Sequence, residues 1–91
     1  MIINISLDAL KAFLEASEDA EMLSEGEYVV DLFDADTPLT VNLKFEKNAC
    51  HVLAAAYLLY DDVQDGWYMG DRIEDEKAVE KAFEDAMRGN Q

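Results

Sequence analysis

Residues 39–46, LTVNLKFE, decide the fold of this chain. The apolar residues Leu39, Val41, Leu43 and Phe45 alternate there with polar ones. Successive side chains of a strand point to opposite faces of a sheet, so this pattern predicts a strand with one buried and one solvated face. Residues 28–33 alternate in the same way, and a turn that contains Asp and Pro separates the two runs. Together they predict an antiparallel β-hairpin.

The segment before the hairpin predicts a helix. Ser6 is a good N-cap, Asp8 in the first turn is favoured by the helix dipole, and apolar residues follow at helical spacing. We expect this helix to reach about Ser17. An extension toward Leu23 is left open, because Gly26 is the first residue that would clearly end it.

Residues 49–61 follow the hairpin and predict a second helix. They are rich in Ala and nearly free of charge, and Asn48 can serve as their N-cap. A helix that is apolar on most sides is buried, so we expect this one at the centre of the core. Residues 64–70, with Trp67 and Tyr68, are expected to form a loop or a short third strand.

The last segment predicts a third helix. From Ile73 onward apolar residues recur at helical spacing, Gly89 is placed to end the helix, and Asp71 and Glu74 have the spacing of a capping box before it. The expected element order is helix, strand, strand, helix, optional strand, helix. This order predicts the α+β class, with about three helices packed on a small antiparallel sheet of two or three strands. We expect residues 1–91 to form a single acidic α+β domain.

Charge is the strongest compositional signal. The chain has 21 Asp and Glu against 7 Lys and Arg, a formal net charge of −14. Acids outnumber bases in the first, middle and last parts of the sequence, so the excess is not confined to a tail. Such a surface repels nucleic acid and anionic membranes and attracts basic proteins. A hydrophobic content of 51% is too high for a disordered acidic chain, so we expect a folded protein with a strongly basic partner.

Residues that could carry chemistry are few. Cys50 and His51 are the single cysteine and the single histidine, too few for a four-ligand zinc site or an intramolecular disulfide. Adjacent residues of a helix point about 100° apart, so we expect no thiolate–imidazole pair. Residues 61–66 place Asp and Gly as in a calcium loop, but Val63 and Arg72 stand where that loop needs oxygen ligands. The sequence therefore predicts no catalytic residue, no metal site and no cofactor.

The N-terminal residues give no targeting signal. They lack a basic segment followed by an apolar run, and no stretch approaches the roughly 20 apolar residues of a membrane span. We expect a cytoplasmic location.

Aromatic and acidic side chains remain as candidates for binding. Trp and Tyr are frequent at the centres of protein interfaces, and we expect Trp67 and Tyr68 to be exposed before the other aromatic residues, most of which should pack in the core. On the last helix Glu recurs at every fourth position, a spacing at which like charges destabilise an isolated helix. Rows of carboxylates this close can present a basic groove with charges like those of a phosphate backbone. The predicted partner-binding residues are Asp61, Asp62, Asp65, Trp67, Tyr68, Asp71, Glu76, Glu80 and Glu84.

In its length, charge, α+β pattern and lack of a catalytic set, the chain resembles the small acidic inhibitors made by phages and mobile elements. These are the anti-CRISPR and anti-restriction proteins that act as DNA mimics. The resemblance covers the whole chain but rests on no sequence motif, so it assigns no residue a role. It implies a non-enzymatic inhibitor that occupies the nucleic-acid-binding surface of a bacterial defence complex, in the host cytoplasm if a phage encodes it.

Two other interpretations stay open. An immunity protein or antitoxin that neutralises one basic toxin would also use acid clusters for fast association. An acidic housekeeping domain of a salt-adapted organism would carry the same charge with no inhibitory role. The sequence also leaves a homodimer open.

Overall fold

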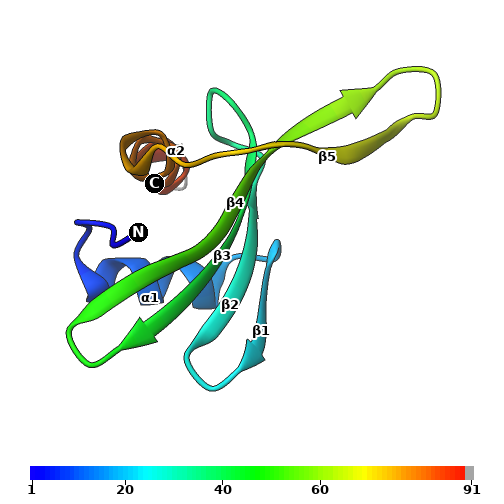
Figure 1. The fold of residues 1–91 in the computed structure, drawn as a ribbon. Coiled ribbons are helices and arrows are strands. Elements are labelled where there is room, and N and C mark those ends of the chain that lie inside the picture. Colours follow the sequence, from blue (N-terminus) through cyan, green and yellow to red (C-terminus); the bar gives the residue numbers. More distant parts are fainter. Residues whose placement is uncertain (90–91) are drawn as a thin grey trace.

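A computed structural model of the chain describes residues 1–89. They form two helices and one five-stranded antiparallel sheet, in which each strand pairs with the next one along the chain (Figure 1). The prediction of about three helices on a sheet of two or three strands is therefore wrong. The elements are α1 (Leu7–Ala16), β1 (Ala20–Ser24), β2 (Glu27–Leu32), β3 (Leu39–Glu46), β4 (Ala49–Asp61), β5 (Gly66–Arg72) and α2 (Glu76–Gly89).

The predicted hairpin is confirmed as β2 and β3. Their register runs without a shift from Glu27 opposite Lys44 to Leu32 opposite Leu39. Val41 and Leu43 of β3 are buried in the core, as the alternating pattern predicts.

The first helix is confirmed, but its extension is not. The Ser6 hydroxyl accepts a hydrogen bond from the Ala9 N–H at 3.4 Å, and α1 ends at Ala16. The chain then forms the edge strand β1, which pairs with β2 through a turn at Gly26. Gly26 has φ of 79°, in the left-handed region that favours glycine.

The predicted central helix over residues 49–61 is wrong, because this segment is the long strand β4. A β-bulge interrupts its pairing with β3: Val52 lies opposite Leu43 and Ala54 opposite Asn42, so Leu53 is an extra residue. The extra residue shifts the phase of the inside–outside alternation. No single period of two therefore runs through the segment, and its alanines gave the stronger helical signal.

Both helices cover the same face of the sheet (Figure 1). Leu10 of α1 and Phe83 of α2 are fully buried there, and Phe13 meets Phe83 edge-on with ring centroids 6.4 Å apart. The opposite face of the sheet carries no helix of the described part of the chain.

The third predicted helix is confirmed as α2, but its cap is a different residue. The Asp75 carboxylate accepts a hydrogen bond from the Lys77 N–H at 3.0 Å, and its carbonyl oxygen accepts one from the Ala78 N–H at 3.1 Å. Asp71, the predicted first residue of a capping box, lies in β5 instead.

Candidate partner-binding surface

β4 and β5 continue beyond the sheet as a two-stranded arm. The last residue of β4 that pairs with β3 is Tyr57, whereas β4 and β5 pair with each other as far as Asp61 and Gly66. Figure 1 shows this hairpin projecting away from the helices and from the other strands. We call residues 58–69 the arm.

The arm is unusually apolar for an exposed element. Trp67 is 48% exposed, Tyr68 52% and Met69 68%, and Leu59 and Tyr60 on the facing strand are also exposed. The predicted exposure of Trp67 and Tyr68 is confirmed, and the strand that the sequence left open over residues 64–70 forms as β5. Contiguous exposed apolar side chains of this kind mark interaction sites on soluble proteins.

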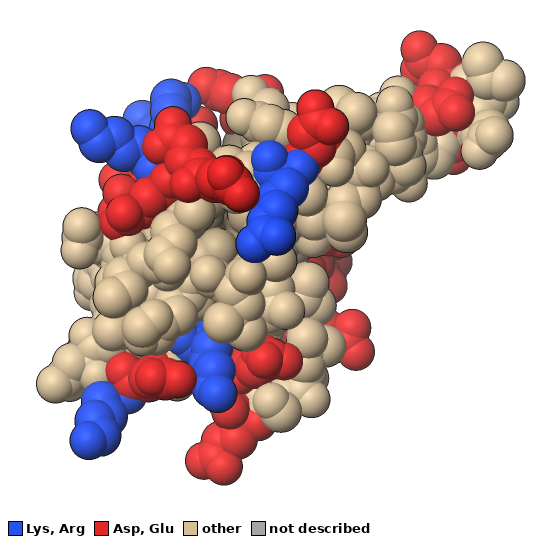
Figure 2. All heavy atoms as spheres, in the orientation of Figure 1, with Lys and Arg blue, Asp and Glu red and all other residues tan. Residues whose placement is uncertain are grey.

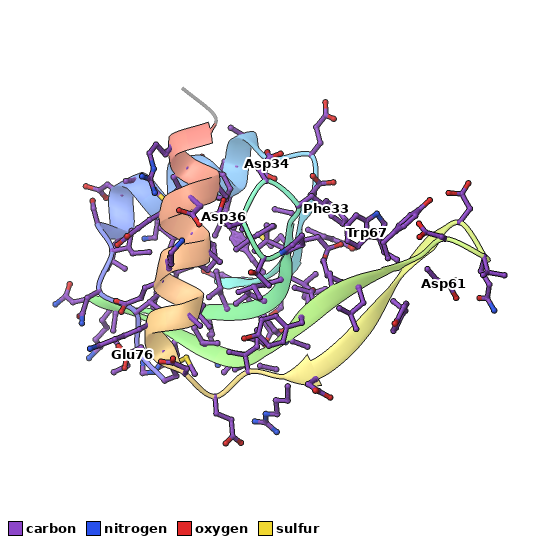
Figure 3. All side chains as sticks on the ribbon, turned by 90° about the horizontal axis from the view of Figure 1, so that it is seen from above. Phe33, Asp34, Asp36, Asp61, Trp67 and Glu76 are labelled. Atoms are coloured by element: carbon purple, nitrogen blue, oxygen red, sulfur yellow. The ribbon has the colours of Figure 1, made fainter. Side chains whose placement is uncertain are left out.

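An aromatic stack lies in the outer half of the arm, one residue pair before its tip turn. The Trp67 ring lies 5.1 Å from the ring of Phe33, just after β2, and 5.3 Å from the ring of Tyr60, its partner on β4. Figure 3 shows Phe33 and Trp67 side by side at this point. One face of the Trp67 side chain is therefore held by packing while the rest remains accessible. Nothing in the sequence indicated that Phe33 would contact Trp67, because only the fold brings the end of β2 close to β5 here.

At the tip of the arm, two predicted binding residues shape the turn. The Asp61 carboxylate accepts hydrogen bonds from the backbone N–H groups of Val63 at 2.9 Å and Gln64 at 3.3 Å. Asp65 has φ of 53° and accepts a hydrogen bond from the Tyr60 hydroxyl. Both roles need an acceptor oxygen but no negative charge, so the charges remain available to a partner. Asp62 is exposed beside them.

The glutamates of α2 do not form a free row. The Glu80 carboxylate accepts a hydrogen bond from the backbone N–H of Asn4 at 2.7 Å and so ties the N-terminal segment to the helix. Glu76 is half-buried, and Glu84 is exposed. Of these three side chains, Glu80 therefore has a structural role that competes with binding to a partner.

Two cations of α2 are engaged with other acids. Lys81 Nζ lies 3.0 Å from Asp85 Oδ2 and 3.4 Å from Asp36 Oδ2, and Arg88 lies 2.7 Å from Asp85 Oδ1. The hydrogen bond from Lys81 lowers the pKa of Asp85, and the bonds to Asp85 and Asp36 raise the pKa of Lys81. The Lys81–Asp36 pair links α2 to the loop between β2 and β3, whereas both pairs of Asp85 lie within α2.

The nine predicted residues lie on two separate surfaces. Asp61 is near the tip of the arm, whereas Glu76 is at the start of α2 on the far side of the molecule (Figure 3). Asp71 lies between them, near the end of β5. In Figure 2 the acids gather over α2, at the arm tip and along the lower edge, with uncharged surface between. A partner that contacts the arm therefore does not contact all nine residues on one flat face.

A third acidic region was not predicted as a site. A hollow of about 700 Å³ lies between α1, the end of β2 and the last turns of α2. Its floor includes Phe13 and Met87, and all of its charged lining residues are carboxylates: Glu18, Asp19, Asp31 and Asp34. Glu18 and Asp19 lie before β1, and Asp31 and Asp34 lie near the end of β2, so the fold brings these two pairs of acids together.

Cys50 and His51 point away from each other. They are neighbours on a strand, so their side chains lie on opposite faces. Cys50 lies in the core, where burial raises the pKa of its thiol to about 11, and His51 Nε2 lies 3.8 Å from Glu46 Oε2 on the open face. A thiol with this pKa is a poor nucleophile at neutral pH.

The acids of residues 1–89 include no group of three side chains placed to hold a metal ion. Neither helix is long and apolar enough to cross a membrane. No protein-family model, curated protein or solved structure matches the chain.

Proposed function

We propose that this protein is a non-enzymatic acidic inhibitor that binds the nucleic-acid-binding surface of a basic protein, such as a component of a bacterial defence complex. The observation that carries the proposal is the arm: exposed aromatic side chains lie beside carboxylates, in a chain of net charge −14. The acids attract a basic groove, and the aromatic residues supply the desolvated contacts that make an interface tight. Such an inhibitor acts in the cytoplasm, where its target acts.

The acids of the arm tip and of α2 fit the role of phosphate mimics in different degrees. Asp62 and Glu84 are exposed, whereas Glu80 is engaged with the N-terminal backbone. We expect the arm tip to supply the first charged contacts, because it projects furthest from the rest of the protein (Figure 1).

The experiment is capture followed by competition. The immobilised protein is incubated with a nuclease-treated bacterial lysate at low salt, and the retained protein is identified. The purified pair is then challenged with single-stranded and duplex DNA at equal phosphate concentration. Release by either DNA supports the proposal. A retained protein that no nucleic acid displaces contradicts it.

A charge-neutral variant tests the acids directly. Changing Asp61, Asp62 and Asp65 to Asn keeps the acceptor oxygens of the turn and removes three charges. Association with the captured protein should slow, and its salt dependence should become shallower. The matched control changes Glu18, Asp19 and Asp34 around the hollow to the corresponding amides. An equal effect of both variants would indicate general electrostatic attraction without a specific surface.

The anchored Trp67 favours a second candidate, an immunity protein or antitoxin. A ring held against Phe33 and Tyr60 is preorganised to fill one pocket of one cognate toxin. In that case Trp67→Ala abolishes binding, the three Asp→Asn changes have little effect, and DNA does not displace the partner.

A further inference from the structure

β5 is an edge strand of the sheet, because it pairs only with β4. An edge strand presents unpaired backbone N–H and C=O groups to any strand that can lie beside it. Proteins usually protect such edges with charged residues, proline, bulges or short strands.

The two edges of this sheet are protected very differently. β1, the other edge, has five residues, contains Glu21 and is interrupted by a register shift between Met22 and Ser24. β5 begins with Gly66-Trp67-Tyr68-Met69-Gly70, which contains no charge and no proline in a chain that is 31% charged. Its register with β4 is regular from Gly66 to Met69, and the register shift of this strand pair comes only after Met69, at Gly70 and Asp71. The protective features of β1 are therefore missing from this part of β5.

Side chains on both faces of this edge are exposed. Trp67 and Met69 lie opposite Tyr60 and Leu58 on one face of the arm, and Tyr68 lies opposite Leu59 on the other. An added strand would therefore meet apolar side chains on both of its own faces.

Acids stand at both ends of the uncharged stretch. Asp65 precedes it and Asp71 follows it, and both are exposed. A second copy of this protein does not match this arrangement. Antiparallel self-pairing centred on Tyr68 would set Asp65 of one copy opposite Asp71 of the other at both ends, and like charges opposite each other destabilise a strand pair.

We propose that the edge of β5 from Gly66 to Gly70 is the docking site for a strand of the partner protein. That strand has an apolar centre and is flanked by Lys or Arg. Backbone pairing adds a sixth strand to the sheet, Trp67, Tyr68 and Met69 contact its apolar side chains, and Asp65 and Asp71 attract its cationic ends. The basic character of this partner rests on the proposed function, whereas the strand-pairing geometry rests on β5 itself.

The probe for this site is a short synthetic peptide of alternating Val and Thr with two Lys at each end. Its binding is followed on the full chain by backbone amide chemical shifts and by titration calorimetry. We expect saturable shifts concentrated at residues 66–71. A peptide with Pro at its centre lacks a backbone donor and should bind about tenfold more weakly or worse.

Two matched variants separate pairing at this edge from general attraction. Met69→Lys places a cation on the β5 edge, and Met22→Lys does the same on β1; the two methionines are similarly exposed, at 68% and 63%. Met69→Lys should weaken peptide binding about tenfold, and Met22→Lys should leave it nearly unchanged. Both changes are at exposed positions, and circular dichroism checks that both variants fold.

Several results would overturn the proposal. One is an absence of shifts at residues 66–71; another is equal affinity for the Pro peptide; a third is equal affinity of the two Lys variants. A dimer of the wild-type chain in analytical ultracentrifugation that Met69→Lys dissociates would identify a second copy as the occupant instead. If the peptide binds β5 but DNA displaces no captured protein, this inference stands and the proposed function fails. If DNA displaces the captured protein but the peptide does not bind β5, only this inference is rejected.

Discussion

Gly26 and Gly66 both adjoin turns of the sheet, but only one of them needs to be glycine. Gly26 has φ of 79°, and a Cβ added to it would lie 3.2 Å from the carbonyl oxygen of Phe45. A Cβ added to Gly66 would meet nothing within 4 Å. The difference is invisible in the sequence, because both residues are simply glycines near a hairpin turn.

We therefore predict that Gly26→Ala lowers the free energy of unfolding by about 1–2 kcal/mol, since a side chain in the left-handed region is strained. Gly66→Ala should change it by less than about 0.5 kcal/mol. Urea denaturation followed by circular dichroism measures both. Equal losses of unfolding free energy in the two variants would show that the left-handed conformation of Gly26 is not the cause of the loss.

For single residues, the sequence predicted those roles that depend on contacts with residues nearby in the chain. The Ser6 cap was predictable because the hydroxyl bonds to an N–H three residues away. The bond from Asn4 to Glu80 and the contact between Phe33 and Trp67 join residues far apart in sequence, so no spacing rule could reveal them.

Among the elements, α2 carries a cluster of ion pairs around Lys81 and Asp85, and one of them reaches Asp36 in the loop between β2 and β3. Lys81 contacts both Asp36 and Asp85, and the Asp85 side chain is only 13% exposed. The lowered pKa of Asp85 means that its ionised form is favoured in the folded protein. Its contribution to stability is therefore complete above the unfolded-state pKa of about 3.9 and is lost as the pH falls through the lower folded value.

We predict that Asp85→Asn lowers stability at pH 7 and that the difference from the wild type shrinks toward zero as the pH falls below about 4. Glu84→Gln at the exposed neighbouring position is the control and should show a much smaller difference at every pH. Urea denaturation at a series of pH values measures the effect. A difference that does not change with pH would mean that the Asp85 charge does not stabilise the fold.

The arm is the element with the least packing. From Leu59 to Asp61, β4 pairs only with β5, and the arm side chains are largely exposed. We predict that backbone amides of residues 59–68 exchange with deuterium much faster than those of the central strand β3, because the arm can open without disrupting the core. Exchange rates as slow as those of β3 would contradict this and would require a contact that protects the arm.

The helices and strands were predictable where the apolar residues keep one period along the whole element. β3 alternates without interruption, whereas β4 changes phase at Leu53 and continues into an arm with no helix beside it. The bulge and the arm depend on pairing with β3 and β5, so the composition of residues 49–61 alone favoured a helix. The candidate site was predictable in its residue types but not in its geometry, since the sequence did not show that α2 and the arm lie apart.

For the whole molecule, charge repulsion opposes folding. A net charge of −14 is carried by a protein whose largest dimension is 43 Å. The Debye length falls from about 30 Å at 0.01 M salt to about 3 Å at 1 M, so added salt screens most of this repulsion. We predict that the melting temperature rises with NaCl over this range and rises equally with KCl.

The salt series also separates a salt-adapted domain from a protein whose acids serve binding. A protein that folds at low salt and gains modest stability fits an inhibitor with a charged binding surface. An absolute requirement for molar salt would favour the salt-adapted domain. A melting temperature that does not rise would mean that the acids are already paired or well separated.

The position of Trp67 determines which structural change its fluorescence reports. It is the single tryptophan of the chain, and it lies at the arm, against Phe33 and Tyr60, with no indole in the helical layer. Intrinsic fluorescence therefore follows detachment of the arm, whereas circular dichroism follows the whole sheet. The two midpoints have no physical reason to coincide, and a denaturation curve recorded by fluorescence alone would mistake a loosened arm for an unfolded protein.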